Sequence, residues 1–147
     1  MDLSQIFGTG YEVIFVAFSG IITAQLIKCI LHLIVKRNLD LRLFTTTGGM
    51  PSSHSAGVMG LSTAVGLIKG FSSIEFAIAL GYAFIVMYDA AGVRRAAGKQ
   101  ASLLNKIIET PGLTGVEVQE RLVEVLGHTP LQVFVGAIIG IIVGSIF

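Results

Sequence analysis

Two histidines stand where the sequence predicts that helices begin. In residues 48–57, GGMPSSHSAG, His54 follows a proline and two serines, and an apolar run continues to residue 68. Serine is favoured at the N-cap and Pro51 has the φ favoured at a helix start, so His54 is expected in the first helical turn. The unpaired amides of that turn, around Ser52 and Ser53, favour an anion. There His54 could pass a proton or attack a phosphoryl group, or it could simply face water.

The second histidine, His128, has a similar setting. Residues 127–130 read GHTP. Glycine is typical of the end of a helix, threonine is a typical cap of the next helix, and proline is typical of a first helical turn. We therefore expect His128, like His54, at a helix N-terminus.

A polar stripe runs along the first apolar segment. Gln25, Lys28, His32 and Lys36 follow one another in steps of three and four, so they share one helix face. Lys28 lies about two turns inside the end of this segment. It either extends its ammonium group to the lipid headgroups or faces the interior and adds positive charge to a site, and the shared face favours the interior.

Further charges follow the third apolar segment. Asp89 stands near its end, where a carboxylate is costly and needs a cation or a donor. Arg94 and Arg95 come next. They could act as signals of topology, as contacts for anionic lipid headgroups or as phosphate ligands. Lys99 lies on the polar face of an amphipathic helix, which either rests on the membrane surface or continues the third segment.

The composition is that of an integral membrane protein. Of 147 residues, 53% are hydrophobic and 13% charged, and the mean hydropathy is +0.83, too apolar for an ordinary soluble domain. The net charge of +1, without a basic run among aromatic residues, argues against nucleic acid as a partner. The single cysteine and the three histidines lack zinc spacing, and no nucleotide-binding motif occurs, so we expect neither a metal nor a cofactor.

Four apolar segments predict an all-α bundle of about four membrane spans, at residues 11–35, 53–68, 73–91 and 133–147. Ser72 and Glu75 have capping-box spacing at the start of the third, and the short connection before it predicts that the second and third spans pack side by side. A short helix is expected at residues 114–125. Glycine and alanine faces suit close helix contacts in lipid and leave a homo-oligomer open. We expect one domain, residues 1–147.

The positive charges predict the orientation. Nearly all lysines and arginines outside the spans fall in the first and third connections, and Lys69 alone lies in the second. The positive-inside rule then places both charged connections in the cytoplasm. His54, Asp89, the arginine pair and His128 should therefore meet at the cytoplasmic side of the membrane, which we expect to be a bacterial cytoplasmic membrane.

Taken together, these stretches resemble a known family. The sequences GGMPSSHSA at 48–56, YDAAGVRRAAGKQA at 88–101 and LGHTP at 126–130 resemble the divergent branch of the phosphatidic acid phosphatase type 2 superfamily, which is related to acid phosphatases and vanadium haloperoxidases. The resemblance extends from about Gln25 into the last span. It implies a helical-bundle phosphatase that uses two histidines.

The resemblance also implies roles by position. His54 resembles the general acid, His128 the nucleophile that becomes phosphohistidine, and Ser52 and Ser53 the phosphate cradle. The chain departs from the superfamily pattern at two of these places, since Ser53 replaces a glycine and Gln132 replaces the aspartate that orients the nucleophile.

Other charged residues could compensate for these departures. Asp89 is expected to orient His128 in place of the missing aspartate. Arg94 or Arg95 is expected to replace the arginine that the superfamily has upstream of the nucleophile, since Arg121 is one residue out of place in this chain. We count Arg94, Arg95, Lys28 and Lys99 among the phosphate ligands.

The sequence thus predicts a membrane phosphatase-like protein that acts on a lipid-borne or amphiphilic phosphomonoester or pyrophosphate through a phosphohistidine. Its partners would be membrane lipids and a phosphorylated lipid or amphiphile. Two alternatives are a non-catalytic binder or carrier of anionic lipid headgroups, and a small structural membrane protein.

Overall fold

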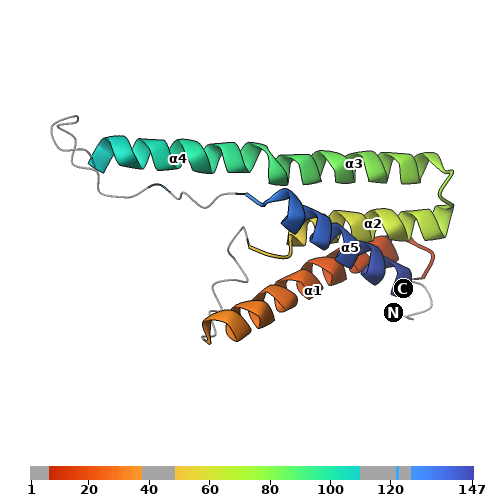
Figure 1. The fold of residues 1–147 in the computed structure, drawn as a ribbon. Helices are drawn as coiled ribbons and strands as arrows, with labels where there is room; N and C mark the ends of the chain where they lie inside the picture. The colour runs from red at the N-terminus through yellow and green to blue at the C-terminus, as the bar shows by residue number, and fades with distance from the viewer. Residues whose placement is uncertain (1–6, 38–48, 110–121, 123–126) are drawn as a thin grey trace.

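The described part of the chain folds into five helices. A computed structural model describes residues 7–37, 49–109, 122 and 127–147, with the backbone alone at residues 93–95. Within these ranges the helices are α1 (Gly10–Lys36), α2 (Ser53–Lys69), α3 (Ile74–Ala91), α4 (Val93–Glu109) and α5 (Pro130–Ile146) (Figure 1). The all-α prediction is confirmed. The predicted segments agree with α1, α2, α3 and α5 to within three residues at each end.

Side-chain caps fix where these helices begin. The Oγ of Ser52 accepts a hydrogen bond from the amide of Ser55, so Ser52 is the N-cap of α2 and His54 lies in its first turn. Thr129 caps α5 in a capping box with Gln132. The cap of α3 is Ser73, whose Oγ accepts from the amide of Phe76. The prediction of a Ser72 cap is therefore wrong by one residue.

Helix α2 is the centre of the bundle and packs against α1, α3 and α5. Gly136, Gly140 and Gly144 of α5 form a ridge against it. A Cβ at Gly140 would lie 2.4 Å from the carbonyl oxygen of Ala56, and one at Gly144 would lie 2.8 Å from the Cβ of Thr63. Only glycine permits such close backbone approach, which is the usual way that helices pack in lipid. The prediction that the second and third spans are neighbours is confirmed, but this α2–α5 ridge was not predicted.

The interior is made of small side chains, and the large apolar ones face outward. Ala24, Ala56 and Ala83 are fully buried, whereas Phe18 and Ile85 are at least 60% exposed. Lipid tails can cover such an apolar exterior, so this distribution is that of a membrane protein rather than a soluble one.

Helix α4 continues nearly on the line of α3 and extends beyond the other helices (Figure 1). The two are joined at Gly92, whose amide donates to the carbonyl of Tyr88 while its own carbonyl accepts from Ala96. Of the two predicted placements of this segment, the continuation of the third span is the one observed. Among the described residues α4 contacts α3 and no other helix.

By length and composition, α1 and the joined helix Ile74–Glu109 are the described helices that could cross a membrane, and α5 is a shorter apolar helix. The number of four spans stays a prediction. The short helix predicted at residues 114–125 lies outside the described residues except for Leu122, which is not helical. Both backbone groups of Leu122 are hydrogen-bonded to the side-chain amide of Asn105 on α4.

Candidate anion site between His54 and His128

The two predicted histidines lie side by side. The ring centroids of His54 and His128 are 5.9 Å apart and the ring planes meet at 65°. Backbone bonds hold three elements together here, because the amide of His128 donates to the carbonyl of Ala90 at 2.9 Å and that of Ser52 donates to the carbonyl of Gln132 at 3.1 Å. The starts of α2 and α5 thus meet at the end of α3.

His128 is held by acceptors on one side of its ring. Its side chain is 2% exposed, and Nδ1 lies 3.1 Å from the carbonyl oxygen of Gly49 and 3.4 Å from Oε1 of Gln132. The buried Nε2 atom has no hydrogen-bond partner among the described residues. Burial lowers the pKa of His128 below its usual value; the Gln132 and Gly49 contacts oppose this shift, and the charges of His54 and Lys28 add to it.

Lys28 reaches this site from α1. It is 4% exposed, and its side chain passes Gly49, where a Cβ would lie 3.5 Å from its Cδ. No ion pair of Lys28 is found in the part of the chain that the structure describes. Of its two predicted placements, the interior one is observed. Burial of an ammonium group is costly, and a nearby anion offsets that cost.

The predicted serine cradle is partly engaged within the protein. Ser52 is fully buried, its amide donates to Gln132 and its Oγ caps α2. Ser53 is buried in the first turn of α2, and its place in a phosphate cradle stays a prediction. Ser55, which was not predicted to take part, is fully buried, and its Oγ has no partner within the described ranges.

The remaining predicted residues lie around or away from this pocket. Asp89 is half-buried in the last turn of α3, next to Ala90. Since Nδ1 of His128 faces Gly49 and Gln132, an orienting role of Asp89 would act elsewhere in the site and stays a prediction.

The cations of α4 are placed differently. Arg94 and Arg95 lie in its first turn, and their side chains fall outside the described part of the structure. Lys99 is exposed on α4, which contacts neither α2 nor α5, so the structure does not bring Lys99 to the histidines. Within the described ranges, no group of three or more His, Cys, Asp or Glu side chains is placed to hold a metal ion.

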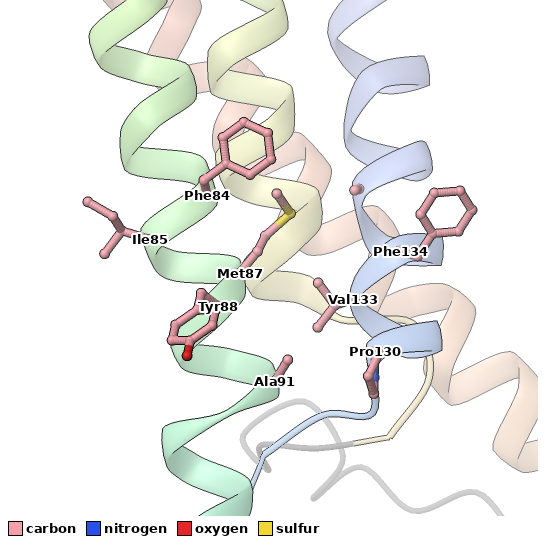
Figure 2. A pocket seen from close by; sticks show the side chains of 9 residues that line it. Phe84, Ile85, Met87, Tyr88, Ala91, Pro130, Val133 and Phe134 are labelled. Atoms are coloured by element: carbon pink, nitrogen blue, oxygen red, sulfur yellow. The ribbon is translucent and has the colours of Figure 1, made fainter.

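An apolar groove of about 660 Å³ runs between α3 and α5 (Figure 2). Phe84 and Met87 line it from α3, and Val133 lines it from α5. At one end Ala91 faces Pro130, and these residues follow closely on Ala90 and His128, which are hydrogen-bonded to each other. At this end the groove is therefore lined by residues close in sequence to the candidate site.

Gly49 contacts His128 and Ser55 follows His54 in the first turn of α2, although the sequence assigned neither to the site; Gln132 stands where the resemblance expects the orienting aspartate. Gly49 has a φ of 81°, which residues with a side chain rarely adopt. The place of Gly49 two residues before Pro51 gave a signal of a turn but no sign that its carbonyl faces a histidine 79 residues away. For Gln132 the signal was its place four residues after His128.

Comparisons with known proteins show the family of the chain. The family model described as "Divergent PAP2 family" matches residues 10–143. A relative from Bacillus subtilis (strain 168), named "Uncharacterized membrane protein YuiD", is 45% identical over 137 residues, which cover 86% of this chain and 87% of the relative. No solved structure matches the chain. The chain is a helical membrane protein and belongs to the Divergent PAP2 family.

Proposed function

We propose that this protein is a membrane phosphatase that acts on a lipid-borne or amphiphilic phosphomonoester or pyrophosphate at the pocket between His54 and His128. The observation that carries the proposal is the pair of imidazoles 5.9 Å apart at the starts of α2 and α5, beside the buried Lys28. Two imidazoles, a cation and a helix N-terminus suit a phosphate group.

The reaction needs one histidine to attack and one to donate a proton. Nε2 of His128 forms a bond to phosphorus while the bond from phosphorus to the leaving-group oxygen breaks, and protonated His54 gives that oxygen its proton. A water oxygen then bonds to phosphorus while neutral His54 takes the proton of the water, and the phosphorus–nitrogen bond breaks to release inorganic phosphate and the free imidazole of His128. Lys28 stabilises the charge on the phosphate oxygens throughout.

The α3–α5 groove supports an amphiphilic substrate over free phosphate esters. Its lining is almost entirely apolar and it ends at Ala91 and Pro130, close along the chain to His128. A hydrocarbon chain in the groove would bring its phosphate to the histidines.

The test is hydrolysis by the full chain in lipid nanodiscs, with long-chain phosphatidic acid, a lipid pyrophosphate and a water-soluble phosphomonoester as substrates. Replacing His54 or His128 with alanine should each abolish release of phosphate, and His128→Ala should also abolish the covalent phosphohistidine seen by mass spectrometry. His32→Ala is the matched control, because His32 lies on α1 outside the pair. Turnover that survives in both variants would refute the proposal.

A non-catalytic binder of anionic lipid headgroups is the second candidate. It is favoured by Gln132, which cannot stabilise an imidazolium by charge as an aspartate would. This candidate predicts binding of phosphatidic acid vesicles that depends on Lys28, with no release of phosphate from any of the three substrates.

The positive-inside rule supports a site on the cytoplasmic side of a bacterial cytoplasmic membrane. A cysteine at the exposed Lys99 position should then be labelled by a membrane-impermeant reagent only after the membrane is opened. Labelling of intact cells would reverse the orientation.

A further inference from the structure

We propose that the carbonyl of Gly49 and the side-chain oxygen of Gln132 hold His128 with its proton on Nδ1, so that the unprotonated Nε2 faces the pocket. Gln132 is then a positioning residue in place of the aspartate that this chain lacks. The inference rests on the proposed function only for what Nε2 attacks, since the position of the proton does not depend on catalysis.

The two groups that face Nδ1 are both acceptors. The group at 3.1 Å is the backbone oxygen of Gly49, which can only accept. The other group is the amide of Gln132, whose orientation is fixed by a separate bond, because the backbone amide of Thr129 donates to Oε1 of Gln132 at 3.0 Å. The NH₂ group cannot take that place, so an oxygen faces the ring at 3.4 Å and Nδ1 must be the donor.

The opposite ring nitrogen is left as the reactive atom. In a neutral imidazole with its proton on Nδ1, Nε2 carries the lone pair. This atom is buried and has no hydrogen-bond partner among the described residues, and the buried Oγ of Ser55, in the first turn of α2 with His54, is likewise without one. A phosphate oxygen could satisfy the hydroxyl of Ser55 while Nε2 attacks the phosphorus.

Burial, together with two cationic groups, disfavours the charged form of the free imidazole. The charged and titratable groups on the elements around His128 are Lys28 on α1, His54 on α2 and Asp89 in the last turn of α3. Burial disfavours the imidazolium most, and His54 and Lys28 add to this effect. Gly49 and Gln132 orient the ring without a full negative charge. A glutamine in place of the aspartate therefore keeps the orientation of the His128 ring but does not stabilise its imidazolium form by charge.

The experiment is ¹⁵N NMR of the histidine-labelled full chain in nanodiscs, as a function of pH and without substrate. The chain has three histidines, so single substitutions of His32 and His54 assign the signals of His128. We expect the ¹⁵N shifts of His128 at neutral pH to be those of the Nδ1–H form. Shifts of the Nε2–H form or of an equal mixture would overturn the proposal.

Gln132→Glu tests the role of Gln132, since glutamate also closes a capping box. A carboxylate at Nδ1 should raise the titration midpoint of His128 by roughly one pH unit or more, and the acidic limb of any hydrolysis profile should move with it. Gln100→Glu, an exposed site on α4, makes the same change away from the ring and should leave the midpoint unchanged. An unchanged midpoint in Gln132→Glu would refute the role, and so would an equal shift in Gln100→Glu.

The outcomes separate the two proposals. If His128 has the Nδ1–H form and responds to Gln132→Glu but no substrate yields phosphohistidine, the proposed phosphatase activity falls and the positioning by Gln132 stands. If phosphohistidine forms but the shifts show the other tautomer, the positioning by Gln132 falls and the proposed phosphatase activity stands.

Discussion

Gly136 lies beneath the first turn of α2, and its replacement with alanine is expected to disturb both the stability of the bundle and the histidine pair. A Cβ at this position would lie 2.3 Å from the carbonyl oxygen of Ser52 and 3.1 Å from its amide nitrogen. Both are backbone atoms of the N-cap residue, so no side-chain rotation can relieve the contact. Ordinary contact begins at 3.4 Å, so the helices must separate by about 1 Å.

That separation has two consequences. It strains the 3.1 Å bond from the amide of Ser52 to the carbonyl of Gln132, and overpacking of this kind lowers the free energy of unfolding by about 1–3 kcal/mol. It also moves the start of α2, and His54 with it, away from His128. Binding of vanadate, a phosphate analogue, should therefore weaken together with stability.

Two other glycines separate these effects in the same assay, which measures denaturant unfolding in detergent and vanadate binding. Gly144→Ala meets Thr63 and Gly60 at 2.8 and 2.9 Å, far along α5 from the histidines, and should lower stability with little effect on binding. Gly81→Ala has no atom within 4 Å and should stabilise α3 by roughly 0.5–1 kcal/mol. If Gly136→Ala unfolds and binds like the unchanged protein, the close α2–α5 contact is wrong.

Three further predictions follow from single contacts. Lys28→Met should weaken binding of inorganic phosphate at least tenfold and raise the pKa of His128, since the charge of Lys28 lowers it; unchanged phosphate affinity would place the anion elsewhere. The pKa of His128 in the folded state lies below 6.5 because of burial, so the unfolded state binds the proton first and the free energy of unfolding should fall as pH decreases below 6.5; His128→Gln should remove this part of the decrease, seen in denaturant unfolding at pH 5 and 7. Ser73→Ala should lower stability by about 1 kcal/mol through loss of the α3 cap, whereas Ser72→Ala should have almost no effect; the opposite order would restore the Ser72 cap.

Local signals in the sequence were sufficient for most helix boundaries. Ser52, Thr129 and Pro130 fix the starts of α2 and α5 through bonds within three residues of the cap, and such bonds depend little on the rest of the fold. At α3 two adjacent serines offer the same chemistry, and Ser73 rather than Ser72 is the cap in the structure. This kind of choice is not encoded in spacing.

The packing partners were harder to predict because they depend on contacts between distant segments. Glycine every fourth residue at 136, 140 and 144 is a signal for close packing, but nothing in the spacing says which helix the ridge meets. The carbonyl of Gly49 shows the same limit. Its contact with His128 is made by a backbone atom, and no residue type marks it.

Gln132 explains why a departure from the superfamily pattern need not remove the function of this site. Its oxygen accepts from the amide of Thr129, which fixes the start of α5, and the same oxygen faces Nδ1 of His128. Glutamine or glutamate at the third position of a helix reaches back to its cap, as the capping box requires. An aspartate here would supply a charge for the imidazole, but its shorter side chain would give up the capping bond. In this chain the same amide therefore helps to fix both the start of the helix and, together with the carbonyl of Gly49, the orientation of the histidine, while burial favours the neutral form of His128.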